Sequence, residues 1–160
     1  MTTAGWREWA DLPALGLSRL KAKMDTGARS SSLHAEDIEI IDADELNGKQ
    51  AWVRFRPAGA ALLVEAPLLE LRAVKDSGGH VTVRPFIQTI LIIGSQRLTI
   101  ELSLIGRAAM LHPLIIGRQA LRGRFSIDPN LCHLLGRPQP SAAFEPVTDR
   151  LSALRRLLQR

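Results

Sequence analysis

The residues best suited to chemistry lie in one short turn, Asp25-Thr26-Gly27, within the stretch KMDTGARSSSLHA. A carboxylate displayed on a tight glycine turn can act as a general base when a second carboxyl group supplies the acid. Asp25 can equally be an ordinary turn residue that caps its own loop. Because such a triplet occurs by chance in on the order of a few per cent of chains this long, its surroundings decide between the two interpretations.

Several features around the triplet favour the catalytic interpretation. Residues 20–24 (LKAKM) alternate apolar and basic side chains, which predicts a half-buried strand that leads directly into Asp25. Ala28 is small and permits a close turn after the triplet. Far downstream, the run Leu114-Ile115-Ile116-Gly117-Arg118 is an apolar segment that ends in glycine.

The number of Asp-Thr-Gly triplets bears on assembly. An aspartate-dependent hydrolase needs two carboxylates that share one proton, so that one activates water and the other polarises the scissile carbonyl. The chain has one such triplet, and Asp128 in FSIDP, near an apolar segment, has no Thr-Gly after it. We therefore expect the second carboxylate to come from a second copy of the chain across a two-fold axis.

Together these motifs resemble the retropepsin-like aspartic peptidases. The closer match is a bacterial subfamily described as ATP-dependent zinc proteases, related to proteins that act alongside ribosomal-protein glutamate ligases. The resemblance rests on KAKMDTGARSSSLHA, RPFIQT, IELSL and LIIGRQALRGRFSIDP, and it covers residues 5–137. It implies an aspartic-type endopeptidase that hydrolyses a peptide or isopeptide-like amide bond as a homodimer.

The resemblance also implies roles for individual residues. Asp25, Thr26 and Gly27 form the catalytic loop; Thr26 holds its counterpart across the dimer, and Gly27 lets the substrate backbone approach closely. A glycine-rich segment at residues 75–80 is the expected flap, a mobile hairpin that closes over substrate. The residues expected to bind substrate or support the site are Ala28, Arg29, Lys75, Gly78, Gly79, His80, Gly117 and Arg118.

One position departs from the family pattern. Retropepsins usually carry an acidic residue four positions after the catalytic aspartate, where it pairs with the arginine of the Ile-Gly-Arg element; here that position is Arg29. We therefore expect Arg118 to be left free, and both arginines to favour acidic or glutamate-rich substrates, because guanidinium groups bind carboxylates in a fork. Alternatively, the two arginines are solvated or pair with Glu36, Asp37 or Asp128.

The elements that position these residues are predicted to be β-strands. About seven to nine short strands punctuated by turns indicate an all-β fold, and the resemblance implies a closed retropepsin-like (acid protease) β-barrel with a short helix after the Ile-Gly-Arg element. Residues 138–160 form a proline-rich linker and a C-terminal amphipathic helix, with Leu151, Leu154, Leu157 and Leu158 at helical spacing. We expect this helix to dock against protein.

The bulk composition limits the environment and the partners. The 160 residues include 46% hydrophobic residues, one cysteine (Cys132) and a net charge of +5. We expect a cytoplasmic protein without a signal peptide or a membrane partner, because no leader pattern or long apolar run is visible. The positive charge favours acidic partners. We expect this partner to be an acidic peptide and not a nucleic acid.

No cofactor or metal is expected. The chain contains neither H-E-x-x-H nor C-x-x-C, and it lacks the phosphate-binding pattern G-x-x-x-x-G-K.

Two alternative functions stay open. One is a non-catalytic module on the same fold that binds acidic peptides or nucleic acid. The other is a zinc-dependent hydrolase whose ligands would come from His34, Glu36, Asp37, His112, Cys132 and His133.

Overall fold

The computed structural model describes residues 1–42, 50–106 and 112–138. Within these ranges the chain forms ten strands, one 3-10 turn and one short α-helix. The predicted C-terminal helix, and all of the predicted linker after residue 138, lie outside the described residues. No helix in the described ranges is long and apolar enough to cross a membrane.

The elements follow the chain in a simple order. The N-terminal half contains β1 (Thr2–Leu12), η1 (Pro13–Leu15), β2 (Leu17–Met24), β3 (Ser31–Ile41), β4 (Trp52–Pro57) and β5 (Val64–Pro67). The C-terminal half contains β6 (Glu70–Lys75), β7 (Val81–Ile93), β8 (Gln96–Ile105), β9 (Leu114–Ile116), α1 (Arg118–Leu121) and β10 (Phe125–Cys132).

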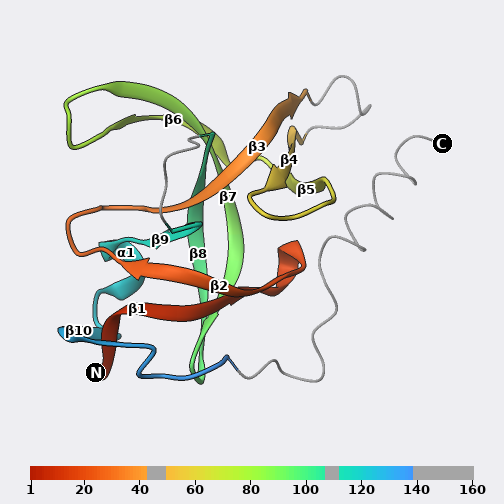
Figure 1. The fold of residues 1–160 in the computed structure, drawn as a ribbon. Helices are drawn as coiled ribbons and strands as arrows, with labels where there is room; N and C mark the ends of the chain where they lie inside the picture. Colours follow the sequence, from red (N-terminus) through yellow and green to blue (C-terminus); the bar gives the residue numbers. More distant parts are fainter. Residues whose placement is uncertain (43–49, 107–111, 139–160) are drawn as a thin grey trace.

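Six of the strands close into a ring within a mixed sheet (Figure 1). The ring runs β1-β2-β9-β3-β8-β7, and β7 returns to β1 through the pairs Ala10 with Ile93 and Asp11 with Ile92. Its most important feature is the place of β9, which lies parallel to β2 and antiparallel to β3. The strand before Asp25 and the strand after it are thereby joined by a segment from far along the sequence.

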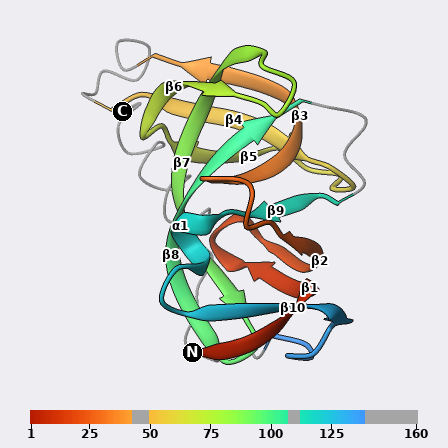
Figure 2. The ribbon, with the colours of Figure 1, turned by 90° about the vertical axis from the view of Figure 1, so that its left-hand side faces the viewer.

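The remaining strands extend this ring (Figure 2). Strand β10 lies parallel to β1, and the two pair from Thr2 with Phe125 onward. Strand β6 forms a long hairpin with β7. Strands β4 and β5 continue outward from the second half of β3.

Apolar side chains from most of these strands meet in one large core. In β7, a run of alternating and then continuous burial places Ile87, Leu91 and Ile93 fully inside. Strands β8 and β9 add Leu102, Leu104, Leu114 and Ile116 to one large, mostly aliphatic cluster of buried residues. The small number of aromatic residues predicted such an aliphatic core, in which burying each leucine or isoleucine contributes about 1.5–3 kcal/mol.

Candidate functional site

Asp25 lies on the loop that follows β2, and backbone groups hold it there. Its amide donates to the carbonyl of Ile116 at 2.9 Å, which ties the loop to the end of β9. Its carboxylate oxygen Oδ1 accepts hydrogen bonds from the amides of Gly27 at 2.9 Å and Ala28 at 3.2 Å. The side chain is 27% exposed, so a carboxylate with a fixed orientation faces the surface.

Gly117 packs against the far end of the same loop. A Cβ atom at this position would lie 2.5 Å from the backbone carbon and oxygen of Ser30, which only glycine avoids. The Gly117 amide donates to Ser31 Oγ at 3.1 Å. On the next residues, the amides of Arg118 and Gln119 donate to the carbonyls of Ala28 and Arg29. The predicted supporting element therefore lies directly against the Asp25 loop.

Arg118 is not left free as the sequence predicted. Its Nη1 donates to the carbonyl oxygens of Thr26 and Gly27, both at 3.0 Å. The arginine therefore takes the backbone of the loop as its partner where an acidic side chain is missing. Arg118 still lines the cleft together with Asp25.

The acidic residues considered as partners for these arginines have other contacts. Glu36 accepts from His34 Nε2 at 2.9 Å, and Asp37 is paired with Arg56 at 3.0 Å. Asp128 accepts a hydrogen bond from the amide of Asn130 in β10. Arg29 is exposed and lines the cleft.

A cleft of about 580 Å³ lies between the Asp25 loop and the β6–β7 hairpin. The hairpin arches over one side of the molecule, and the loop between β2 and β3 lies below it (Figure 1). Four cationic residues and two acidic residues line the cleft: Arg29, Lys75, Arg84, Arg118, Asp25 and Asp76. Its floor includes Ser32, Ile105 and Ile115. The cleft is thus large enough for several side chains and is net positive.

The tip of the hairpin is organised by Asp76. Its Oδ1 accepts hydrogen bonds from the amides of Gly78 and His80, both at 2.9 Å. Its own amide donates to the His80 carbonyl, and the Gly79 amide donates to the Asp76 carbonyl. Gly79 has a φ of +84°, a conformation that suits glycine. The predicted glycine-rich tip is therefore a compact turn built around one carboxylate.

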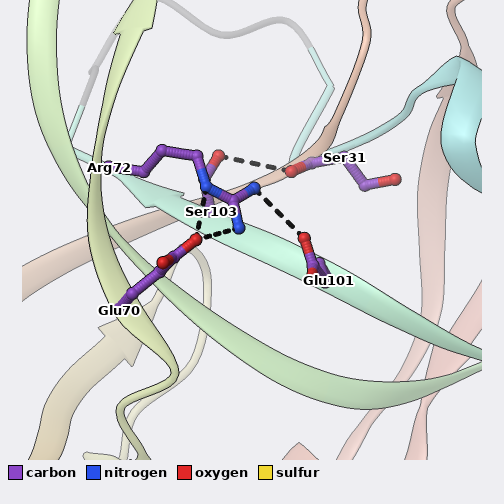
Figure 3. Close-up of polar contacts among 5 residues, drawn as sticks. All are labelled: Ser31, Glu70, Arg72, Glu101 and Ser103. Atoms are coloured by element: carbon purple, nitrogen blue, oxygen red, sulfur yellow. Dashed lines mark hydrogen bonds and ion pairs between the residues drawn. The ribbon is translucent and has the colours of Figure 1, made fainter.

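The base of the hairpin is fastened to the ring by Arg72 (Figure 3). On one side its guanidinium donates to Glu70 of the same strand, and on the other Nη1 donates to Glu101 of β8 at 3.1 Å. The guanidinium also stacks over the Phe86 ring, 4.2 Å from its centroid. These contacts raise the pKa of Arg72, chiefly through Glu70. The hairpin thus has a fixed base and a separate, turn-stabilised tip.

Ser32 lines the cleft at the place where β3 pairs with β8. Ser103 donates to the Ser31 carbonyl at 3.2 Å (Figure 3), and its Oγ lies 2.8 Å from Ser32 Oγ. Ser32 and Ser103 are buried. Polar groups therefore interrupt an otherwise aliphatic floor close to the Asp25 loop.

The structure brings together most of the predicted site residues but not all. Those that line the cleft are Asp25, Gly27, Ala28, Arg29, Lys75 and Arg118. Gly117 supports the loop from behind, and Gly78, Gly79 and His80 shape the turn of the hairpin rather than the cleft wall. Residues that the sequence did not single out are Ser32, Asp76, Arg84 and Ile105, which line the cleft, and Lys23, which lies beside Asp25. Only the strand register identifies most of them.

The residues considered as zinc ligands do not form a metal centre within the described ranges. No group of three histidine, cysteine, aspartate or glutamate side chains that could hold a metal ion occurs there. His34 is instead hydrogen-bonded to Glu36, and His133 stacks on Trp9 at 4.4 Å between ring centroids. His112 packs edge-on against Trp6.

One family model and one solved structure match most of the chain. The RimB-like family model, described as the retropepsin-like aspartic endopeptidase RimB, matches residues 3–138. A crystal structure of a protein of unknown function (DUF785) from Legionella pneumophila superposes with a TM-score of 0.68. The two sequences are 30% identical, and the match covers 84% of this chain and 98% of that chain.

Curated relatives are longer proteins. A probable alpha-L-glutamate ligase from Parasynechococcus marenigrum is 35% identical over 94% of this chain and 34% of its own length. Another, from Desulfotalea psychrophila, is 33% identical over 82% of this chain and 29% of its own length. The chain therefore spans about a third of the length of these relatives.

Proposed function

The chain belongs to the RimB-like family of retropepsin-like aspartic endopeptidases, and from this premise we propose that Asp25 is its catalytic carboxylate. The proposal includes cleavage of a peptide or isopeptide-like amide bond by an Asp25 pair formed across a homodimer. The observation that carries it is the geometry of one loop. A partly exposed carboxylate is fixed by the amides of Gly27 and Ala28 and borders a large cleft.

The proposed chemistry follows from two carboxylates that share one proton. The ionised Asp25 removes a proton from a water molecule, and the resulting hydroxide attacks the carbonyl carbon of the substrate. The protonated Asp25 of the second copy hydrogen-bonds to the carbonyl oxygen and stabilises the charge that develops there. Proton transfer to the leaving amine then breaks the bond between carbon and nitrogen.

The need for a second copy is supported by what surrounds Asp25 in one copy. Within the described residues, the groups in contact with its carboxylate are two backbone amides and Lys23. The other cleft carboxylate, Asp76, is held by the amides of the hairpin tip. A two-fold axis beside the Asp25 loop would supply an identical carboxylate at the right place.

The cleft lining supports an acidic substrate, such as a glutamate-rich segment. Cations outnumber carboxylates around Asp25, and Arg29 occupies the position where related peptidases carry an acid. The hairpin tip, which holds Lys75 and Asp76 over the cleft, is the proposed flap. The names of the longer relatives agree in chemistry, since each is a probable alpha-L-glutamate ligase.

Replacement of Asp25 by asparagine tests the catalytic proposal. Asparagine is nearly isosteric but cannot act as the base, so we expect the variant to fold and to lose at least about a thousandfold in kcat. The measurement is hydrolysis of glutamate-rich peptides followed by mass spectrometry, with circular dichroism to check the fold. Sedimentation of the wild-type chain should show a dimer, because the second Asp25 carboxylate is proposed to come from a second copy. Full activity in the variant, or activity that disappears with a chelator and returns with zinc, would refute the proposal.

Replacement of Arg29 by alanine tests the acidic-substrate proposal. A partly desolvated contact between arginine and a carboxylate contributes about 1.5–3 kcal/mol, and screening by solvent reduces this at an exposed site. We therefore expect the ratio of kcat/KM for glutamate-rich over neutral peptides to fall by about tenfold. Arg122→Ala removes the same charge from an exposed residue that does not line the cleft. An unchanged ratio in Arg29→Ala would contradict the proposal.

A further inference from the structure

Three cations on β1 and β2 extend the cleft floor beyond its edge, and we propose that they bind an acidic side chain of the substrate next to the cleaved bond. These residues are Arg7, Lys21 and Lys23, which we call the cationic row. The inference rests on the proposed function, because it names a further specificity site for the same reaction. It concerns a different surface from Arg29 and the hairpin, since none of the three lines the cleft itself.

The register of the strands places the row on the same face as the cleft floor. Lys23 lies opposite Ile115 of β9, and Ile115 lies opposite Ser32 of β3. On the other side, Lys23 lies opposite Arg7 of β1. Directly paired residues on neighbouring strands point to the same face of a sheet. Since Ile115 and Ser32 line the cleft, one line of side chains runs from Ser32 through Ile115 and Lys23 to Arg7.

This line passes directly beside the proposed catalytic group. Lys23 Nζ lies 3.8 Å from Asp25 Oδ2, and the Lys23 side chain is 45% exposed. Lys21 is two residues earlier on the same face of β2, opposite Trp9. A substrate whose scissile bond lies at Asp25 would therefore place a neighbouring side chain over Lys23 and Arg7.

The cationic row has more positive charge than its neighbours neutralise. Among the residues that the structure describes, Lys23 pairs with Asp25, and no carboxylate forms an ion pair with Arg7 or Lys21. The two cations lie over indole rings instead: Arg7 is 5.1 Å from the Trp6 centroid, and Lys21 Nζ is 6.0 Å from that of Trp9. Such contacts hold a cation in place without neutralising it.

The surroundings of His112 are further evidence that Arg7, Lys21 and Lys23 lie close together. Its ring packs edge-on against Trp6, with 5.8 Å between centroids. Its pKa is lowered by burial and, beyond that, by repulsion from Arg7, Lys23 and Lys21. A place where three cations disfavour a further positive charge is one where an anionic ligand is favoured. Charge complementarity therefore points to a carboxylate of the substrate.

Peptide binding without turnover tests this inference. The probe is a fluorescently labelled hexaglutamate peptide, with labelled hexaglutamine for comparison, and the background is the Asp25→Asn chain. We expect hexaglutamate to bind more tightly than hexaglutamine, and Arg7→Gln, Lys21→Gln or Lys23→Gln to weaken it by about fivefold at low salt. Lys23→Arg, which keeps the charge, should retain most of the binding. Arg122→Gln is the control for loss of one positive charge elsewhere.

Each other outcome would overturn the inference. Equal binding of the two peptides would exclude a site for carboxylates. If Arg122→Gln weakened hexaglutamate binding as much as the row variants do, the loss would be explained by net charge alone. If the row variants lost affinity for a labelled single-stranded oligonucleotide but not for hexaglutamate, the surface would bind nucleic acid instead. Turnover by the wild-type chain and by Asp25→Asn is measured separately, so failure of the proposed function is distinguishable from failure of this site.

Discussion

At the scale of single residues, Asp25 owes its position to the backbone around it. The amides of Gly27 and Ala28 hold one carboxylate oxygen, and the Ile116 carbonyl holds the amide of Asp25 itself. Arg118 then fastens two carbonyls of the same loop. The two hydrogen bonds from these amides restrain rotation of the Asp25 side chain, so its carboxylate keeps one orientation.

Gly117→Ala should damage the site more than Gly106→Ala. The new Cβ would lie 2.5 Å from Ser30 backbone atoms, which cannot move without displacing the loop. We expect a loss of about 1–3 kcal/mol in the free energy of unfolding, as for overpacked cores, together with a large loss of activity. Urea denaturation and peptide hydrolysis measure the two effects.

Gly106→Ala is the matched control, because its Cβ would make an ordinary contact at 3.5 Å with the Ala35 carbonyl. We expect it to change the free energy of unfolding by less than about 0.5 kcal/mol. Similar losses in both variants would show that the close approach of Gly117 to the loop is unimportant.

At the scale of elements, the β6–β7 hairpin combines a fastened base with a tip held by one carboxylate. Arg72 joins the base to Glu101 of β8, whereas the tip depends on Asp76 and its bonds to the amides of Gly78 and His80. The two parts can therefore be altered separately, which allows the proposed flap to be tested without unfolding the ring.

Asp76→Ala should loosen the tip while leaving the fold intact. Alanine removes the acceptor of two backbone amides, so we expect faster amide exchange at residues 76–80 and a lower kcat/KM by about tenfold. Asp76→Asn keeps a carbonyl acceptor and should restore part of the activity. A melting temperature close to that of the wild type is the control for the fold. If Asp76→Ala hydrolyses peptides normally, the tip is not a flap.

Alternation along the chain predicted many of the strands but not all of their partners. The alternation in LKAKM correctly indicated β2. Strand β10 was missed, because FSIDPNLC contains a proline and several polar residues, and its pairing with β1 is parallel and non-local. Local sequence carries little information about such a contact.

Residues of the site were predictable only where a motif carries them. The Asp25 triplet and the Ile-Gly-Arg element are visible in the sequence, and the structure joins them. Lys23 was seen only as part of an alternating strand, because its place beside Arg7 and Ile115 depends on the register of three strands. Asp76 was hidden within a glycine-rich turn. The predicted freedom of Arg118 was wrong, because backbone carbonyls can replace an acidic partner.

At the scale of the whole molecule, His112 links stability to pH. Its pKa is lowered in the folded chain, first by burial and then by Arg7, Lys23 and Lys21. The unfolded chain therefore takes up the proton first as the pH falls. The stabilising effect of neutral His112 is complete above its ordinary pKa of about 6.5, and it decreases as the pH falls through that value toward the lowered one.

We predict that His112→Gln reduces this pH dependence. The urea midpoint of the wild-type chain should fall between pH 7.5 and pH 5, about one unit or more on either side of the ordinary histidine pKa. The fall should be smaller in the variant, because its side chain does not titrate. Identical profiles for the two chains would show that His112 contributes nothing to the pH dependence of folding.

The strand pairings that complete the Asp25 loop also decide when the site can form. Residues 22–24 pair with residues 114–116, and Thr2 pairs with Phe125. Proteins dominated by such distant pairings fold slowly, in about milliseconds to seconds. While the chain is being synthesised, the Asp25 loop has no support until Gly117 and its neighbours have emerged. The proposed catalytic site can therefore form only after the segment around Gly117, more than ninety residues beyond Asp25, has been synthesised.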